Sequence, residues 1–102
     1  FSASDDFAAI LDLEPATVDV VPSRQGDEWR LALCHRRGPA ALGLVVEDAR
    51  PWRSAGWAVP SDSGLDLLPG ESRTIGVAWR AAPVAGRRLR VDGWNVEAAD
   101  VA

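Results

Sequence analysis

The chain has 102 residues, of which 47% are hydrophobic and 25% are charged, with 15 acidic residues against 11 basic ones. This length supplies one hydrophobic core but is too short for a catalytic barrel or a doubly wound sheet. The net charge of −4 argues against a nucleic-acid partner, because phosphate binding requires clustered cations. No apolar run approaches the roughly 20 residues of a membrane span, so we expect no membrane partner.

The ends and the rare residues suggest where the chain comes from. It begins at Phe1, contains no methionine and shows no signal-peptide pattern, so we expect it to be part of a longer protein. The single Cys34 cannot form an internal disulfide, which leaves secreted and cytoplasmic locations open. All the basic residues are arginine, and tyrosine is absent. This bias fits GC-rich coding and a bacterial source.

The first third of the chain predicts a linker and two strands. Residues 1–14 are expected to form a linker with one helical turn, because Phe7, Ile10 and Leu11 are spaced to bury one side. Residues 17–20 alternate polar and apolar side chains, as in a half-buried strand. A turn over 22–27 follows. The next strand then places Trp29, Leu31 and Leu33 on its inner face.

The middle of the chain predicts a central strand and a long connection. Over 41–47, period-two alternation places Leu42, Leu44 and Val46 on one face. The stretch 48–64 contains two prolines and two glycines, so we expect an irregular connection with up to two short edge strands.

A short strand at 65–67 and a tight turn at 69–70 lead into the most regular strand, 73–80. This strand directs Ile75, Val77 and Trp79 inward. The last predicted strand, near 88–95, turns Leu89 and Val91 inward, and we expect Arg87, Arg88 and Arg90 to form a solvated face.

The strand pattern as a whole predicts an all-β fold. About seven short antiparallel strands at roughly ten-residue spacing, with no long helix, are typical of an immunoglobulin-like or fibronectin-like β-sandwich. We expect the sandwich to occupy residues 15–96, after the linker of residues 1–14, and residues 97–102 to form a C-terminal tail.

The sequence contains few residues in arrangements that suit catalysis. The only histidine, His35, ends a strand beside two arginines, which does not suit a nucleophilic triad. The carboxylate pairs Asp5/Asp6 and Glu47/Asp48 are neighbours in sequence, whereas a glycosidase needs two carboxylates facing each other across a sugar. We therefore predict no catalytic residue, no metal site and no cofactor in this chain.

Five tryptophans are the most unusual feature of the composition. Trp29 and Trp79 share the inward register of leucine, isoleucine and valine, so we assign them to the core. Trp52 and Trp57 lie in the irregular connection, and Trp94 points opposite to Val91. Because planar rings stack on sugars and also fill interfaces, these three are candidates for a sugar contact or a domain interface.

Three ordered stretches carry a resemblance to a known family. The segment Leu-Leu-Pro-Gly-Glu-Ser-Arg-Thr at 67–74 and the segment Val-Asp-Gly-Trp-Asn-Val at 91–96 resemble the last immunoglobulin-like domain of exo-β-D-glucosaminidases. These enzymes belong, with β-mannosidases, to glycoside hydrolase family 2. The opening at 6–13, running into 15–18, resembles the linker that precedes that domain. Relatives carry Ser-Asp-Asn-aromatic where this chain has Ser-Asp-Ser-Gly at 61–64.

The resemblance implies a non-catalytic accessory domain in a larger retaining glycosidase, whose catalytic glutamates lie on a separate barrel. The expected partners are other domains of the same chain. The family stretches add Asp62 and Asn95 to the tryptophans as candidate interface or sugar contacts. The alternative is an autonomous carbohydrate-binding or adhesion module that uses Trp52 and Trp57 as a stacking platform.

Overall fold

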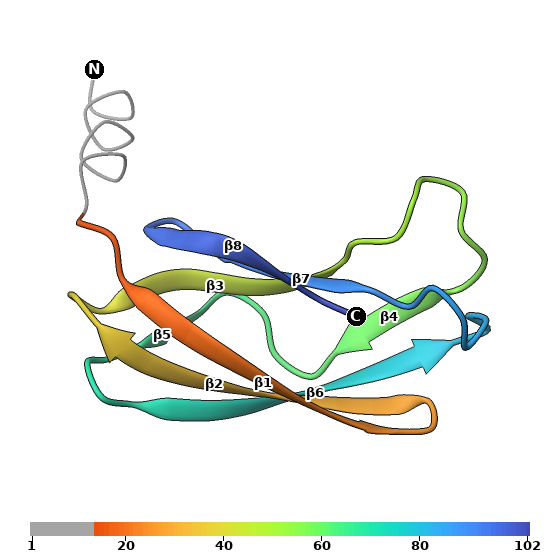
Figure 1. The fold of residues 1–102 in the computed structure, drawn as a ribbon, viewed down its shortest axis with the longest axis horizontal. Helices are drawn as coiled ribbons and strands as arrows, with labels where there is room; N and C mark the ends of the chain where they lie inside the picture. Colours follow the sequence, from red (N-terminus) through yellow and green to blue (C-terminus); the bar gives the residue numbers. More distant parts are fainter. Residues whose placement is uncertain (1–13) are drawn as a thin grey trace.

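The computed structural model describes residues 14–102, and within them the chain forms strands and no helix (Figure 1). The strands are β1 (Thr17–Gln25), β2 (Glu28–Arg37), β3 (Ala41–Asp48), β4 (Trp57–Pro60), β5 (Leu65–Leu67), β6 (Ser72–Arg80), β7 (Leu89–Gly93) and β8 (Val96–Val101). The helical turn predicted within the linker of residues 1–14 lies outside the described residues. Among residues 14–102, no helix is long and apolar enough to cross a bilayer.

The strands form two four-stranded sheets with the core between them (Figure 1). One sheet has the order β1-β2-β6-β4 and the other has the order β5-β3-β7-β8. All strand pairs in the two sheets are antiparallel. The predicted all-β sandwich is therefore confirmed at this level, with eight strands in the described part of the chain rather than about seven.

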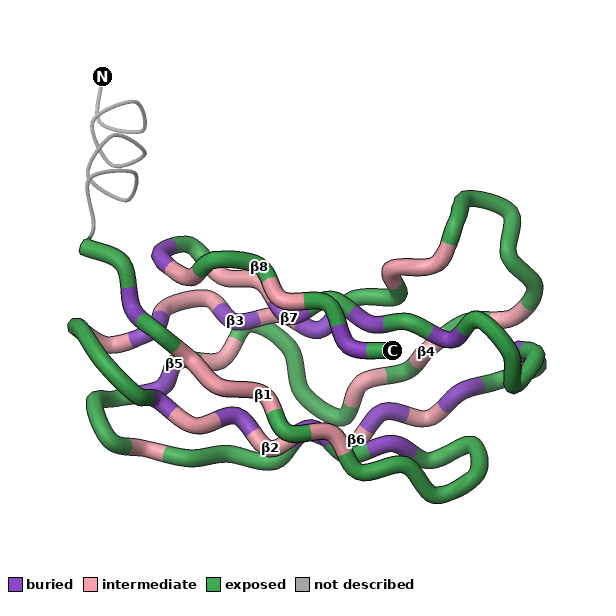
Figure 2. Tube along the Cα trace, in the orientation of Figure 1, coloured by how far each residue is buried: buried purple, intermediate pink, exposed green. Residues whose placement is uncertain are grey.

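Alternating side chains build the core, as Figure 2 shows in the bands of buried residues along β2 and β6. The fully buried side chains are Leu31, Leu33, Leu44, Leu67, Ile75, Val77, Trp79, Leu89 and Val91. Trp29 is also buried, and its ring meets Trp79 edge to face with centroids 5.4 Å apart. The predicted inward registers of β2, β6 and β7 are confirmed, because each face repeats an apolar residue at every second position.

A bulge in β3 changes the register that the sequence predicts. Ala41, Leu44 and Val46 are buried, whereas Leu42 is only half-buried. The pairing of β3 with β5 shifts between Ala41 and Leu44, and Gly43 between them has a φ of 63°. The prediction that Leu42 shares a face with Leu44 and Val46 was wrong, because a bulge adds one residue and turns the preceding side chains over.

The C-terminal segment also differs from the prediction. Residues 97–102, expected to be a tail, belong almost entirely to β8, which pairs with β7 and places Val101 opposite Leu89. Val101 is 7% exposed and joins the core. The adjacent alanines of β8, Ala98 and Ala99, weaken its alternation, which is why the sequence pattern missed the strand.

The turn predicted over 22–27 is much shorter in the structure. β1 continues through Pro22 to Gln25, and only Gly26 and Asp27 remain between β1 and β2. Pro22 is tolerated because β1 lies at the edge of its sheet, where a missing N–H donor breaks no ladder.

The loops gather at two opposite ends of the sandwich (Figure 1). The chain enters the sandwich at one end, beside the β2–β3, β5–β6 and β7–β8 turns, and we name this the entry end. The β1–β2, β3–β4 and β6–β7 connections lie at the other end, which we name the far end. A parallel bridge between Ala16 and Val96 ties the start of the chain to the second sheet before β1 joins the first.

Candidate functional site

Trp94 lies in the β7–β8 turn at the entry end, and 61% of its surface is exposed. Its amide donates to the Leu42 carbonyl at 2.9 Å, and its ring lies directly over Gly43. A Cβ atom at Gly43 would stand 2.9 Å from the ring atom Cε2, so only glycine leaves room for the indole. The bulge in β3 therefore supports one side of an indole whose remaining surface faces outward.

Asn95, the next residue, joins the incoming chain to the start of β3 in the second sheet. Its side-chain amide donates to the carbonyls of Glu14 at 3.1 Å and Ala40 at 2.9 Å, and its Oδ1 accepts from the Leu42 amide at 2.9 Å. Its own carbonyl accepts from the Ala16 amide at 2.8 Å. Asn95 is 7% exposed, and both hydrogens of its side-chain amide are already donated within the domain, so the side chain holds the incoming chain in place.

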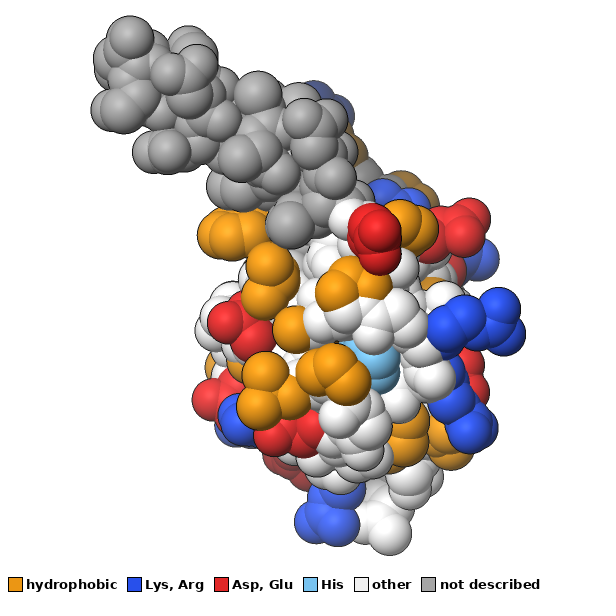
Figure 3. Space-filling model, turned by 90° about the vertical axis from the view of Figure 1, so that its left-hand side faces the viewer, with side chains coloured by type: hydrophobic (Ala, Val, Ile, Leu, Met, Phe, Trp, Pro, Cys, Tyr) orange, Lys and Arg blue, Asp and Glu red, His pale blue; other side chains and the backbone are white. Residues whose placement is uncertain are grey.

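His35 braces the turns at the same end. It is 7% exposed, its Nε2 lies 2.6 Å from the Pro39 carbonyl, and its Nδ1 accepts from the Gly70 amide at 3.3 Å. These contacts fix the tautomer with the proton on Nε2 and link the β2–β3 loop to the β5–β6 turn. Leu68 in that turn is 60% exposed. Figure 3 shows hydrophobic groups spread around the histidine on this end of the molecule.

Trp52 lies in the β3–β4 connection at the far end, with 89% of its surface exposed. It occupies a turn that closes when the Ser54 amide and hydroxyl both donate to the Pro51 carbonyl, at 3.1 and 2.7 Å. Arg53 takes the left-handed conformation there, with a φ of 77°. The indole is therefore presented to solvent by a hydrogen-bonded turn.

Arg50 holds this connection against the core. Its guanidinium binds Asp48 with Nε and Nη2 and donates to the carbonyls of Ala55 at 2.7 Å and Gly56 at 3.1 Å. The guanidinium carbon lies 5.0 Å from the centroid of the buried Trp79 ring. The hydrogen bond from the Arg50 side chain is the main reason that the pKa of Asp48 is lowered.

Trp57 and Val59 lie on the edge strand β4 and are 57% and 43% exposed. They sit opposite Arg80 and Ala78 of β6. Asp62 follows in the connection to β5 and is exposed, and none of the hydrogen bonds found among residues 14–102 involves its side chain.

Four of the five candidate residues are thus separated along the length of the sandwich, and Asp62 lies between β4 and β5. Trp94 and Asn95 lie at the entry end, whereas Trp52 and Trp57 belong to the connection and strand that begin at the far end (Figure 1). They do not form one site. The alternation along the sequence predicts which face of a sheet a side chain occupies. It does not predict the end of the sandwich at which a residue lies, because that depends on the direction of each strand.

The neighbouring carboxylates of β3 do not face a common space. Glu47 and Asp48 alternate on β3, with Glu47 opposite Arg90 and Asp48 opposite Leu89. They therefore point to opposite sides of the sheet. No group of three or more histidine, cysteine or acidic side chains lies close enough to hold a metal ion in the part of the chain that the structure describes.

Arg87 is a residue whose role the sequence analysis missed. We expected it on a solvated strand face, but it precedes β7 and its side chain is 4% exposed. It donates to the carbonyls of Pro83, Gly26 and Ala82 and pairs with Asp27 at 2.7 Å. The only sequence feature that could have indicated this role is the turn composition before Arg87. The alternation of inward and outward side chains does not apply to Arg87, because it begins only with β7.

Comparisons with known proteins give this geometry no external reference. No protein-family model, curated protein or solved structure matches the chain.

Proposed function

We propose that this chain is a non-catalytic, immunoglobulin-like accessory domain of a multi-domain family 2 glycoside hydrolase, similar to exo-β-D-glucosaminidases and β-mannosidases. In this proposal the domain packs through its entry end on a neighbouring domain of the same protein and stabilises it. The observation that carries the proposal is the exposure of Trp94 and Leu68, 61% and 60%, at the end where the chain enters the sandwich.

The position of these side chains favours an interface with a preceding domain. A domain joined by a short linker lies near the point where the linker meets the sandwich. Burying one large apolar side chain stabilises a contact by about 1.5–3 kcal/mol relative to leaving it in water. Trp94 is already oriented by Gly43 and by its amide hydrogen bond, so little conformational freedom is lost when it is covered.

The position of the stretches that resemble the family also favours an interface at the entry end. Stretch 67–74 contains the β5–β6 turn with Leu68, and stretch 91–96 contains the β7–β8 turn with Trp94. The stretch at 15–18 starts β1, and Ala16 bonds to the Asn95 carbonyl at 2.8 Å. Likeness concentrated at these two turns and at the start of β1 suits a surface that is fitted to a neighbouring domain.

In this proposal, catalysis belongs to another domain of the parent enzyme. The parent enzyme would be a retaining O-glycosidase whose acid and nucleophile are glutamates on a barrel domain, and no residue of this chain matches those motifs. The departure at Ser63 and Gly64 lies in the connection between β4 and β5, away from the β5–β6 turn. An interface through the entry end is therefore compatible with that departure.

A substitution at the entry end tests this proposal. Leu68→Ser should lower the melting temperature of the intact parent enzyme by several degrees, because it removes about 2 kcal/mol of buried contact. The same change should barely affect the 102-residue chain by itself, where Leu68 is exposed.

The matched control is Val21→Ser, since Val21 is 59% exposed on the edge strand β1. This substitution should leave the melting temperature unchanged in both the intact enzyme and the 102-residue chain. An equal response of the intact enzyme to both substitutions would contradict packing through the entry end, and a coding sequence without a barrel domain upstream of Phe1 would remove the proposal altogether.

A second candidate function rests on Trp52. An indole with 89% of its surface exposed, on a turn closed by Ser54 and braced by Arg50, suits stacking on a sugar ring. Calorimetry with chitosan and mannan oligomers distinguishes the two. Binding that is lost in Trp52→Ala and Trp57→Ala but kept in Trp94→Ala would favour an autonomous carbohydrate-binding module, and no binding is expected of an accessory domain.

A further inference from the structure

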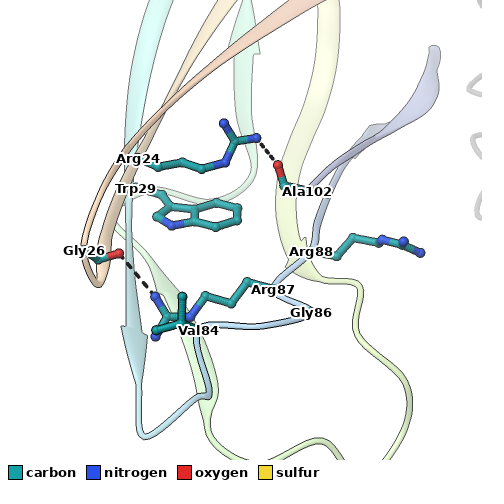
Figure 4. Close-up of a pocket in the computed structure, with 8 residues that line it drawn as sticks. All are labelled: Arg24, Gly26, Trp29, Val84, Gly86, Arg87, Arg88 and Ala102. Carbon is teal, nitrogen blue, oxygen red and sulfur yellow. Dashed lines mark hydrogen bonds between the residues drawn. The ribbon is translucent and has the colours of Figure 1, made fainter.

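Trp94 presents an exposed aromatic face at the entry end, with 61% of its surface accessible. The arginine–tryptophan contacts found among residues 14–102 involve only the two core tryptophans. Arg24 lies over Trp29 with its guanidinium carbon 5.1 Å from the ring centroid (Figure 4), and Arg50 lies over Trp79 at 5.0 Å. Trp94 offers the same kind of ring, and the electron-rich face of an indole attracts a guanidinium group.

Gly43 brings a carboxylate close to the Trp94 ring. The Gly43 amide donates to Oδ1 of Asp66 at 2.9 Å, and a Cβ atom on the same glycine would stand 2.9 Å from the ring atom Cε2. The carboxylate comes from β5 on one side of β3, and the indole comes from the β7–β8 turn on the other side. Asp66 is exposed and takes part in none of the ion pairs found within residues 14–102. A carboxylate beside an indole suits a guanidinium, which binds the first with its N–H edge and the second with its face.

The charge around this pair of groups is mainly negative. The outer face of the second sheet carries the carboxylates of Glu47, Asp66, Asp92 and Asp100 together with the guanidinium of Arg90. Arg90 is already paired with Asp100, at 2.9 Å. The remaining carboxylates attract a cation and repel an anion. Charge complementarity therefore favours a basic side chain as the group that covers Trp94.

We propose that Trp94 and Asp66 bind a guanidinium group, and that in the intact protein this group is an arginine of the neighbouring domain. The inference deepens the proposed function and rests on it for the partner. The plane of the guanidinium lies against the indole, and its N–H groups donate to the Asp66 carboxylate. Arg50 makes the same combination of contacts within the domain, where it lies over Trp79 and binds Asp48 with Nε and Nη2.

Titration of the 102-residue chain with N-acetylarginine amide, followed by ¹H–¹⁵N NMR at constant ionic strength, tests the site. The arginine probe should shift the indole N–H signal of Trp94 and the amide signal of Gly43, with a dissociation constant on the order of 10 mM. N-acetylcitrulline amide has nearly the same shape without the charge and should bind about tenfold more weakly. N-acetyllysine amide keeps the charge without the planar group and should bind about threefold more weakly.

Asp66→Asn removes the charge and keeps the local structure, because the asparagine oxygen still accepts from the Gly43 amide. It should weaken binding of the arginine probe about threefold. Glu28→Gln removes the same charge from the outer face of the first sheet and should change nothing. Trp52, 89% exposed at the far end, is the reference indole in the same sample and should not distinguish the arginine probe from the citrulline probe. The spectrum of each variant reports whether it is folded.

Three results would overturn the proposal. They are equal affinity of Trp94 for the arginine and citrulline probes, equal responses of Trp94 and Trp52 to the arginine probe, and equal weakening by Asp66→Asn and Glu28→Gln. Protection of Trp94 in the parent protein without selective binding of the arginine probe would overturn the guanidinium site and support the accessory role. Selective binding with Trp94 equally exposed in the parent protein would support the guanidinium site and overturn the accessory role.

Discussion

The contact between Gly43 and Trp94 is possible because glycine has no Cβ atom. Gly43 has a φ of 63°, and a Cβ atom there would lie 2.9 Å from the Trp94 ring. Gly43→Ala should therefore destabilise the domain by about 3 kcal/mol, through left-handed strain and through displacement of the indole. The free energy of unfolding, measured by urea denaturation, gives this value.

Gly64→Ala separates the two causes. Gly64 has a similar φ of 68°, but an added Cβ would meet nothing within 4 Å. This variant should lose only about 1 kcal/mol, the cost of the backbone conformation. Equal losses for the two alanine variants would show that the Trp94 ring is not seated on Gly43.

Arg87 is the residue whose removal should cost most at the far end. Arg87→Met leaves the carbonyls of Gly26, Ala82 and Pro83 without their donor and should lower the free energy of unfolding by about 3 kcal/mol. Arg88→Met, at the exposed neighbour, should stay within about 0.5 kcal/mol of the parent chain. Thermal and urea denaturation compare them, and similar losses for both would contradict a structural role for Arg87.

At the scale of elements, the strength of the apolar alternation decided what the sequence could predict. β2 and β6 carry tryptophan, leucine, isoleucine and valine at every second position, and their inner faces were predicted correctly. β3 was predicted as a strand, but its bulge at Gly43 depends on the Trp94 ring, which comes from a distant turn. β8 was missed because its alanines bury too little apolar surface to show a pattern.

The candidate site was less predictable than the fold. Trp29 and Trp79 could be assigned to the core from register alone. The role of Asn95 could not, because its partners Glu14, Ala40 and Leu42 come from separate parts of the chain. The prediction of a solvated strand face for Arg87 failed for a similar reason. It extended to Arg87 an alternation that starts only with β7, at Leu89.

The β3–β4 connection should respond to pH through Asp48. Its pKa is lowered in the folded state, chiefly by the Arg50 hydrogen bond, so its contribution to stability is present above the unfolded pKa of about 3.9. That contribution is lost as the pH falls through the lower folded pKa. The difference in unfolding free energy between the parent chain and Asp48→Asn should therefore be largest near pH 7 and should shrink toward pH 2. A difference that is constant with pH would contradict the ion pair.

At the scale of the whole molecule, the two ends of the sandwich differ in character. The entry end carries exposed apolar side chains, Trp94 and Leu68, on turns fixed by Asn95 and His35. The far end carries buried arginines, Arg50 and Arg87, that brace its connections beside Trp79. This polarity gives the domain one end suited to a protein contact and another that is held together by its own arginines.

The most direct test of the accessory role is the solvent exposure of Trp94 in the intact protein. Oxidative footprinting would compare its rate of modification in the proposed parent protein with that in the 102-residue chain, and Trp52, 89% exposed at the far end, serves as the internal reference. We predict that Trp94 is protected at least about fivefold in the intact protein while Trp52 is unchanged. Equal modification of Trp94 in both forms would contradict packing through the entry end.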